Sequence, residues 1–383
     1  GGGAPAAPAP APAPPPVRAP PPSQAPAPVP PNGGEYALDW RAEGTTFFDD
    51  FNFITHDSNH GASHFLGSFE EARDAGVVEV DSAHVVLRAG PKSDTRFKRK
   101  SAKIGTKKNW KHFLAMLRYS HVPHGCGVWP AFYTLGAGQW PMAGEMDILE
   151  YVHDMGSMTS FHTGRQCKLD SVEVNRYKPM PDANAGGNAG EQYNCYTEYC
   201  DTCHSLGCAP NVQPLLTGQE WANRPGVIAM ERTAEFAKIF FIPDGEIPQD
   251  VWEDTPRPSG WDKWLIAYYP FAASPGCPNP DDIMAEQHFI LGIAFCGDWA
   301  SKVWGLSGRC VGMGPTFNAT ATDYKLPIAP EQQQCRSVDP LAEHAPAEDC
   351  CTQFVADENG AFGADEHLRQ SAFFDMSWFK VYT

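Results

Sequence analysis

Three carboxylates fall within six residues of the segment Gly144-Glu145-Met146-Asp147-Ile148-Leu149-Glu150. Because side chains on a β-strand alternate between two faces, Glu145 and Asp147 share one face. Glu150 joins that face only if a β-bulge around Ile148–Leu149 adds one residue. Two carboxyl groups that flank a glycosidic bond can cleave it, one attacking the anomeric carbon and the other protonating the leaving oxygen. This is the predicted chemistry, and a solvated acidic strand or a short helix is the structural alternative.

Aromatic residues flank this acidic segment on both sides. Trp129-Pro130-Ala131-Phe132-Tyr133 and Trp140-Pro141 precede it, and Phe161-His162-Thr163 follows it. An indole can stack on the apolar face of a pyranose while neighbouring polar groups bind the sugar hydroxyls. The flanks therefore favour a sugar-binding cleft over a solvated acidic strand. His162, taken alone, is better explained as a structural histidine.

A rigid sheet must hold these acids, and the rest of the sequence predicts one. Short apolar runs rich in aromatic and β-branched residues recur between turn signals, and few amphipathic helices are evident. We therefore expect an all-β fold, an antiparallel β-sandwich with long loops or insertions at 170–220 and 305–372. The predicted strands include Phe47–Phe53, Val77–Val80, Val85–Arg88, Phe113–Tyr119, Trp129–Leu135, Val227–Glu231, Lys238–Ile242, Phe289–Phe295 and Phe373–Tyr382. In the last of these, one face is predicted to carry Phe374, Met376, Trp378 and Lys380.

The amino-acid composition limits which classes of partner the protein can bind and indicates where it is located. The 383 residues carry a formal net charge of −17. Nucleic acids and anionic membrane surfaces require a basic patch, so we expect neither as a partner. No run of 18 apolar residues is present, so these residues predict no membrane span. Twelve Cys and the glycosylation acceptor Asn318-Ala319-Thr320 favour an oxidising location, secreted or on the cell surface.

The N-terminal segment differs in amino-acid composition from the rest of the chain. Residues 1–31 contain 14 Pro and 9 Ala, and Arg18 is their one charged residue. Such a composition cannot bury a core and favours extended polyproline II conformations. We predict a disordered Pro/Ala-rich linker over residues 1–34 and a catalytic domain over 35–383, with a Cys-rich insertion at about 306–372. A ligand segment for SH3-like domains is the alternative for the linker.

These motifs together resemble glycoside hydrolase family 16, in its laminarinase-type branch. That branch carries W-P-A-F-W, then W-P, then G-E-I-D-I-I-E, which are matched by Trp129–Tyr133, Trp140-Pro141 and Gly144–Glu150. The resemblance covers residues 36–305 and the last predicted strand. Further matching segments are Phe161-His162-Thr163, Val227–Glu231, Ile242–Pro248, Phe295–Trp299 and Trp378–Tyr382.

The resemblance implies a concanavalin A-like β-jelly-roll whose concave sheet forms a glycan-binding cleft. It implies an endo-β-1,3(4)-glucanase that hydrolyses β-1,3- or mixed β-1,3/1,4-glucan with retention, by double displacement. Carried over by position, Glu145 is the nucleophile, Asp147 the assisting acid and Glu150 the general acid/base. The substrate-binding residues carried over in the same way are Tyr133, Trp140, His162 and Trp299.

Several positions depart from the family pattern. We expect these departures to affect sugar-binding subsites more than the catalytic chemistry. Tyr133 stands where a second Trp is usual, Tyr151 replaces a Gly, and Arg232 stands where Trp is common. A glucan transglycosylase, in which a sugar hydroxyl replaces water, would use the same acids and stays open. A non-catalytic β-glucan-binding protein is a further alternative, although relatives that only bind typically lose the acids.

The cysteines offer alternatives to hydrolysis, which we weigh against disulfides. One set is spaced C-x4-C-x2-C-x4-C, which is similar to ferredoxin, c-type haem and zinc patterns. We expect disulfides instead, and adjacent Cys350 and Cys351 are expected to pair elsewhere. We predict no required cofactor and no catalytic metal, the sequence does not support a structural calcium, and we expect a monomer. The spaced set is Cys195, Cys200, Cys203 and Cys208.

Overall fold

The computed structural model describes most of the chain beyond the Pro/Ala-rich segment. The predicted linker, Asn318-Ala319-Thr320, Cys200 with Cys203 and most of the predicted insertion lie outside the described residues. The described ranges are 36–56, 61–92, 98–177, 193–197, 207–209, 216–304, 350–357 and 364–383, with the short pieces 310, 316–317 and 335–336.

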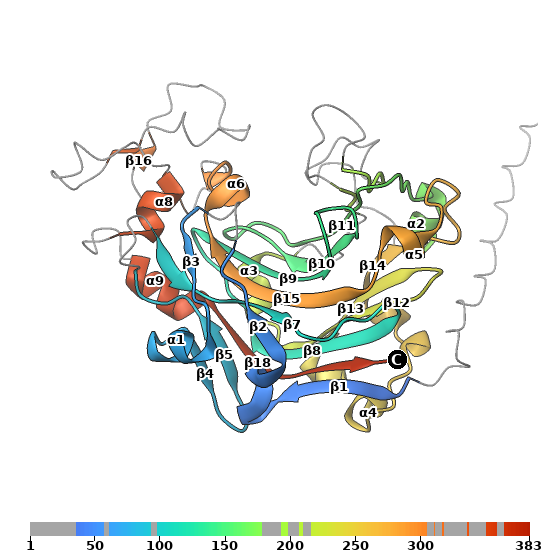
Figure 1. Cartoon of the computed structure of the whole chain (residues 1–383), viewed down its shortest axis with the longest axis horizontal. Helices are drawn as coiled ribbons and strands as arrows, with labels where there is room; N and C mark the ends of the chain where they lie inside the picture. The colour runs from blue at the N-terminus through green and yellow to red at the C-terminus, as the bar shows by residue number, and fades with distance from the viewer. Residues whose placement is uncertain are drawn as a thin grey trace, which may run out of the picture.

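Two antiparallel sheets are stacked face to face (Figure 1). The outer sheet has eight strands, and β1 pairs with β18 beside the main strand order. In spatial order it contains β14 (Leu265–Tyr269), β13 (Ala237–Pro243), β12 (Gly226–Arg232), β8 (Phe113–His121), β18 (Phe373–Tyr382), β5 (Val85–Arg88) and β4 (Val78–Val80), with β1 (Leu38–Glu43) added to β18.

The inner sheet has six strands and carries the acidic segment on β10. Neighbouring strands pair in antiparallel register throughout. In spatial order they are β11 (Met158–His162), β10 (Glu145–Glu150), β9 (Val128–Gly136), β15 (Gln287–Phe295), β7 (Lys103–Thr106) and β2 (Phe51–Phe53). Two small pairs complete the strands: β3 (Ser63–Phe65) with β6 (Arg99–Ser101), and β16 (Thr316–Phe317) with β17 (Cys335–Arg336).

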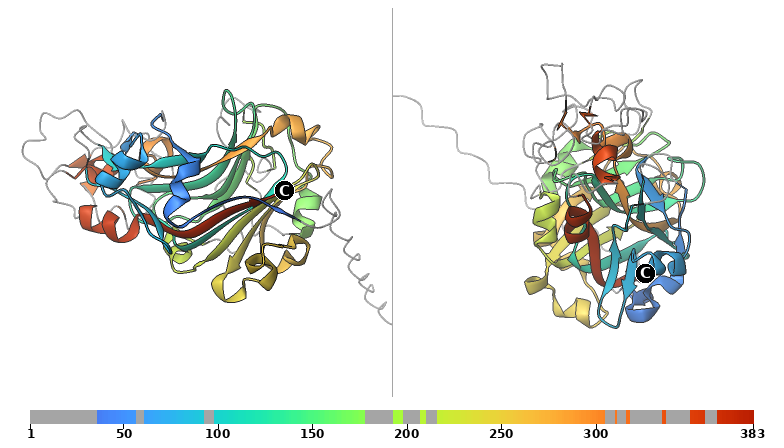
Figure 2. Two further views of the ribbon diagram at one scale, coloured as in Figure 1. Left: turned by 60° about the horizontal axis from the view of Figure 1, so that its bottom comes forward. Right: turned by 90° about the vertical axis from the view of Figure 1, so that its left-hand side faces the viewer.

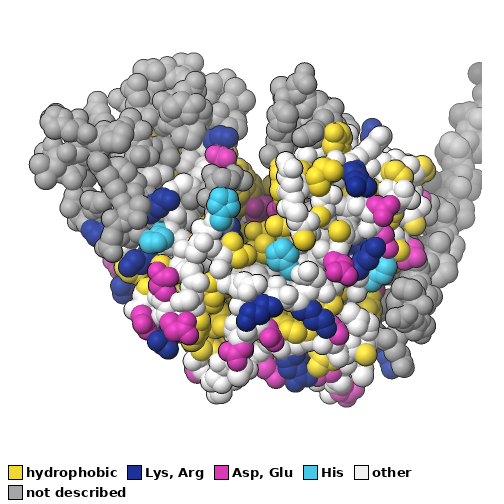
Figure 3. Space-filling model, viewed as in Figure 1, with side chains coloured by type: hydrophobic (Ala, Val, Ile, Leu, Met, Phe, Trp, Pro, Cys, Tyr) yellow, Lys and Arg dark blue, Asp and Glu magenta, His cyan; other side chains and the backbone are white. Residues whose placement is uncertain are grey.

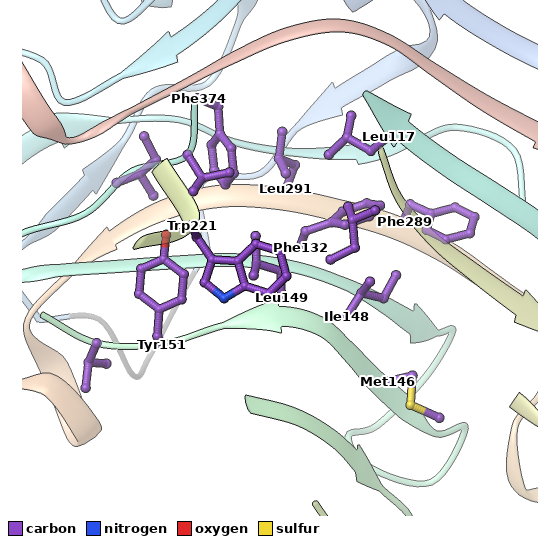
Figure 4. Close-up of a cluster of buried hydrophobic side chains, with 14 of the residues drawn as sticks. Leu117, Phe132, Met146, Ile148, Leu149, Tyr151, Trp221, Phe289, Leu291 and Phe374 are labelled. Carbon is purple, nitrogen blue, oxygen red and sulfur yellow. The ribbon is translucent and has the colours of Figure 1, made fainter. Parts of the chain in front are cut away.

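The core lies between the two sheets. Burial alternates residue by residue along β9, so one face of the strand packs inward while the other stays partly open. Phe379 of the outer sheet meets Phe132 and Phe289 of the inner sheet edge-on, with ring centroids 5.5 Å and 5.1 Å away. Figure 4 shows part of the core, with labelled side chains from β8, β9, β10 and β15. The predicted all-β sandwich is confirmed.

Helices are short and lie at the ends and edges of the sandwich. Local capping explains where some begin: the Ser68 side chain accepts from the Glu71 amide, and Thr217 with Glu220 forms a capping box. Figure 2 shows the red helices α8 and α9 at one end of the sandwich. The helices are α1 (Phe69–Asp74), α2 (Ser171–Tyr177), α3 (Gly218–Ala222), α4 (Gln249–Trp252), α5 (Pro280–Ile283), α6 (Gly297–Ala300), α8 (Cys350–Val355), α9 (Ala364–Ser371), and the 3-10 turns η1 (Gly44–Asp50), η2 (Asp244–Glu246), η3 (Pro258–Gly260) and η4 (Asp262–Trp264).

Two strand predictions were wrong in detail. The run Phe47–Phe53 is mostly the 3-10 turn η1, because Phe47, Phe48 and Phe51 all turn into the core at helical spacing. In β18, Met376 pairs with Tyr119 and Trp378 with Arg118, so the strand has an extra residue between them. Regions predicted to be long loops or insertions also contain helices, namely α2 and α3 in the first and α8 and α9 in the second.

The bulge in β18 reverses which residues face inward. Phe374 and Met376 lie in the main core before it, and Phe379 lies there after it. Trp378 belongs to a smaller cluster on the other side of the outer sheet. The prediction that Phe374, Met376, Trp378 and Lys380 share one face is therefore wrong, because one extra residue exchanges the faces.

Disulfides tie the loops to the sandwich. Cys195 pairs with Cys208, so these two members of the spaced cysteine set are not metal ligands. Cys351 pairs with Cys296 rather than with Cys350, as predicted. The described bonds are Cys126–Cys310, Cys167–Cys277, Cys195–Cys208 and Cys296–Cys351.

Candidate active site

The acidic segment forms β10, and it contains the predicted β-bulge. Against β9, Asp147 pairs with Tyr133 and the next pair is Leu149 with Phe132, which leaves Ile148 as the extra residue. Ile148 and Leu149 are consecutive, yet both are buried in the core, at 1% and 2% exposure. The bulge therefore returns Glu150 to the face of the sheet that carries Glu145 and Asp147.

All three carboxylates thus lie on the face of the inner sheet that points away from the core. In β9, the pairing partners of Glu145, Asp147 and Glu150 are Leu135, Tyr133 and Ala131, which form the half-buried side of that strand. Figure 3 shows the molecule hollowed on this side, with hydrophobic and acidic side chains in the hollow.

Each outer carboxylate accepts a hydrogen bond from its own indole. Trp140 Nε1 donates to Oε2 of Glu145, and Trp129 Nε1 donates to Oε1 of Glu150 at 2.7 Å. Trp140 comes from the turn that joins β9 to β10, whereas Trp129 stands near the start of β9. The two acids therefore have separate donors on separate elements.

Asp147, between them, is held by the neighbouring strand β11. Its Oδ2 accepts from Ser160 Oγ at 2.9 Å and from His162 Nε2 at 3.0 Å. Asp147 is almost fully buried, and both donors belong to residues that are themselves buried. These bonds hold the Asp147 carboxylate on the strand between the two glutamates.

Burial and the repulsion between neighbouring carboxylates shift the pKa values of the acids in this cluster. Burial raises the pKa of Glu145 well above its usual value, the charge of Asp147 raises it further, and the Trp140 bond opposes the rise. Burial and the Asp147 charge likewise raise the pKa of Glu150, against the bond from Trp129. Burial alone would lower the pKa of His162, but its hydrogen bond to Asp147 and the charge of that residue outweigh this and raise it.

The raised pKa of Glu150 keeps a proton on a carboxyl group at a pH where free glutamate is ionised. A protonated carboxyl beside an ionised one is what acid-assisted displacement at a sugar carbon requires. The arrangement of the three acids can therefore support glycosidic bond cleavage.

The predicted substrate-binding residues surround these acids at different distances. Tyr133 pairs directly with Asp147 across the strands, and His162 pairs with Glu145. Trp140 is 42% exposed, and its ring lies 6.0 Å from that of His162. Trp299, on α6, contacts Trp129, whose ring it meets edge-on at 5.6 Å.

Sequence reasoning did not assign Trp129 or Ser160 to the site. Trp129 begins the Trp129–Tyr133 motif, and its position four residues before Tyr133 places it on the same face of a strand, which is a signal for the site. Ser160 stands two residues before His162, so it shares that face of β11 by the same rule. Lys103, on β7, was also missed, and its positive charge opposes the rise in the pKa of Glu145.

A metal or cofactor site is a separate question. In the described ranges, no three His, Cys, Asp or Glu side chains gather in a way that could hold a metal ion. The expectation that catalysis needs no cofactor stays a prediction.

Comparison with known proteins agrees with the chemistry that this geometry can support. A family model described as "XgeA-like, catalytic GH16 domain" matches residues 51–325. An endo-1,3(4)-beta-glucanase of Arthroderma benhamiae is 33% identical over 288 residues, which are 73% of this chain and 59% of that protein. A probable glycosidase of Schizosaccharomyces pombe is 29% identical over 281 residues, 72% of this chain and 63% of that protein. The chain thus spans less than two thirds of the length of these relatives.

Solved structures share the fold. An elongating β-1,3-glucosyltransferase of GH family 16 superposes with a TM-score of 0.65 at 24% identity, covering 91% of this chain and 100% of that one. Laminarinase 16A from Phanerochaete chrysosporium, with β-glucans in its donor and acceptor sites, gives a TM-score of 0.63 at 23% identity, with the same coverage. The jelly-roll architecture predicted from the sequence is confirmed.

Proposed function

Because this chain belongs to glycoside hydrolase family 16, we propose that it is a retaining endo-β-1,3(4)-glucanase of the laminarinase type. The observation that carries the proposal is the β10 bulge, which places Glu145, Asp147 and Glu150 on one open face of the inner sheet. The fungal relative that is 33% identical is itself an endo-1,3(4)-beta-glucanase, which supports β-1,3- or mixed β-1,3/1,4-glucan as the substrate.

In the first step, a carboxylate oxygen of Glu145 attacks the anomeric carbon. The glycosidic C–O bond breaks as the ester bond forms, and Glu150 gives its proton to the leaving sugar oxygen. Burial favours the protonated form of Glu150 before this step. The Trp140 hydrogen bond favours the ionised form of Glu145 and holds its second oxygen.

In the second step, water attacks the same carbon. Glu150, now a carboxylate, takes a proton from that water, the new C–O bond forms, and Glu145 leaves as a carboxylate. The Trp129 hydrogen bond stabilises the ionised Glu150 during this step. Two inversions give net retention at the anomeric carbon.

Asp147 assists both steps from between the glutamates. Its negative charge raises the pKa values of both neighbours, so it helps to keep a proton on the pair. Ser160 and His162 fix its position, and the positive charge of protonated His162 offsets part of the accumulated negative charge. Trp140, Tyr133 and Trp299 are proposed to stack on or contact sugar rings.

The proposal includes an extracellular location, a glucan partner and a monomeric protein without a cofactor. Four disulfides in the described residues support an oxidising compartment. Within the same residues, no helix is both long enough and apolar enough to cross a bilayer.

Product analysis tests the proposal. The protein is incubated with laminarin, mixed-linked β-glucan, xyloglucan and agarose, with Glu145→Gln as the matched control. We expect oligosaccharides from laminarin or mixed-linked glucan, and none from the variant. Equal turnover by Glu145→Gln would show that the nucleophile is wrongly assigned.

The alternatives from the sequence give different results in the same assay. Products longer than the starting oligosaccharide, rising with added acceptor, would indicate a transglycosylase. Glucan binding without any product would indicate a binding protein, which the presence of all three acids argues against.

A further inference from the structure

The turn between β9 and β10 places both the proposed nucleophile and its hydrogen-bond donor. It carries Trp140 and ends at Gly144, directly before Glu145. The turn is closed by backbone hydrogen bonds from the Gly136 amide to the Gly144 carbonyl and from the Gly144 amide to the Pro141 carbonyl, at 3.1 Å and 3.0 Å. Its position relative to the sheet therefore sets where Glu145 begins.

A second segment, residues 280–287, lies directly against this turn. The Ala285 amide donates to the Ala143 carbonyl at 3.1 Å, and Gln287 Nε2 donates to the same carbonyl at 2.9 Å. Gly144 approaches so closely that a Cβ there would lie 2.9 Å from the Ile283 carbonyl oxygen. Any shift of this segment is therefore transmitted to the turn.

Arg232, the last residue of β12, holds that segment in place. Its side chain has no solvent exposure, and it belongs to the other sheet of the sandwich. Nη2 donates to Asp281 Oδ1 at 2.7 Å and to the Met284 carbonyl at 3.0 Å, while Nη1 donates to the Lys111 carbonyl at 2.5 Å. A planar guanidinium presents its N–H donors to these acceptors in a rigid fork, whereas an ammonium group is a compact charge on a flexible stem.

Asp281 completes the network from the surface side. Its Oδ1 also accepts from His112 Nε2 at 2.9 Å, and its side chain is one-third exposed. Burial alone would raise the pKa of Asp281, but the bonds from His112 and Arg232 and the Arg232 charge outweigh it and lower it. The carboxylate is thus a stable anchor for the guanidinium.

We propose that Arg232 and Asp281 form a positioning network that acts through residues 280–287 to fix the Trp140 turn and Glu145. The inference rests on the proposed function, since it assigns these residues to placing the nucleophile. Neither residue touches the acids, so both are positioning residues. Arg232 is also a position at which the sequence departs from the family pattern.

The labelling rate of Glu145 tests this assignment. The probe is 2,4-dinitrophenyl 2-deoxy-2-fluoro-β-laminaribioside: Glu145 forms an ester with its anomeric carbon, and dinitrophenolate departs with the bonding electrons. This leaving group needs no proton, so the rate reports on Glu145 rather than Glu150.

Two variants break the network at opposite ends. Asp281→Asn removes the charged partner of Arg232, and Gln287→Met removes the donor to Ala143 at similar volume. Asp244→Asn is the matched control, because Asp244 binds Arg118 at 3.0 Å on the outer sheet, away from the acids. Arg232→Lys, which keeps the charge but loses the planar geometry, is a third variant.

We expect Asp281→Asn and Gln287→Met, checked as folded by near-UV circular dichroism, to label about 10- to 100-fold more slowly. Their double variant should be no slower than the slower single, because both break one path. Asp244→Asn should label at the normal rate. A folded Asp281→Asn with normal labelling, or fully additive single effects, would overturn the proposal.

Hydrogen exchange separates this inference from the proposed function. Amides of the peptide covering 137–146 should exchange faster in Asp281→Asn and Gln287→Met than in Asp244→Asn. If the wild-type protein is not labelled, the proposed function fails, and exchange still decides the positioning role. Unchanged exchange in both variants would refute the network whatever the activity.

Discussion

Trp129, on β9, donates its indole N–H to Oε1 of Glu150 at 2.7 Å. The Trp129 ring also meets the ring of Trp299 edge-on, with centroids 5.6 Å apart. Glu145 depends on a different indole, that of Trp140. The two glutamates can therefore be perturbed one at a time.

Trp129→Phe should alter the pH dependence of catalysis. The lost hydrogen bond favours the ionised form of Glu150, so its removal raises the pKa of that carboxyl further. The alkaline limb of the kcat/KM profile should move up by about one pH unit, and kcat at the optimum should fall about tenfold. The matched control Trp299→Phe keeps the bond, so its limb should not move. An unmoved limb in Trp129→Phe would contradict the role given to this indole.

Glu145→Gln should stabilise the fold at neutral pH. Because the folded-state pKa of Glu145 is raised, its contribution to stability is full below the unfolded value, about 4.3, and is lost as pH rises through the folded value. Each unit of elevation corresponds to about 1.4 kcal/mol. In urea unfolding, the variant should have a larger free energy of unfolding than the wild type at pH 7, and the difference should disappear at pH 4. A variant less stable than the wild type at pH 7 would contradict the assigned direction.

Gly144→Ala should lower both stability and activity. Gly144 has φ of +78°, and an added Cβ would lie 2.9 Å from the Ile283 carbonyl. The conformation alone costs about 1–2 kcal/mol, and the contact adds to it. Gly138→Ala is the matched control, since its φ is +115° with no atom near the new Cβ. Equal losses of kcat in the two folded variants would remove any special role for the contact with Ile283.

Replacing Cys195 and Cys208 together by Ala should weaken the strand that carries His162. Cys208 exchanges backbone bonds with Phe161 at 2.8 Å and 2.9 Å, and the Thr163 amide donates to the Cys195 carbonyl at 2.9 Å. The Cys195–Cys208 disulfide joins residues that are 13 apart in the sequence, so its loss should lower the free energy of unfolding by about 3 kcal/mol. Thermal melting and kcat, measured together, should both fall. Full kcat in the folded double variant would show that the loop does not help to hold His162.

Much of this fold could be predicted from local pattern. The alternation and turn signals predicted most of the long strands, and the bulge in β10 was predicted because Glu150 would otherwise face the core. The acidic motif and its Trp-Pro flanks indicate the family, and the family match confirms it. Each of these features is determined by residues that are close together in the sequence.

What the sequence did not predict depends on distant contacts or on an unmarked extra residue. The bulge near Met376 in β18 has no acid to reveal it, so the faces of Trp378 and Phe379 were exchanged in the prediction. The Arg232–Asp281 contact joins positions 49 residues apart, and no local spacing indicates it. The catalytic roles themselves stay predictions.

The bulge at Ile148 also limits how this segment can change over evolution. Removing one residue from β10 would restore regular alternation and turn Glu150 towards the core. Substitutions at Met146, Ile148 or Leu149 need only preserve apolar volume, whereas a change of length moves a carboxylate to the other face. In an alignment of related chains, a gap inside Gly144–Glu150 would therefore indicate lost catalysis more reliably than any single apolar replacement there.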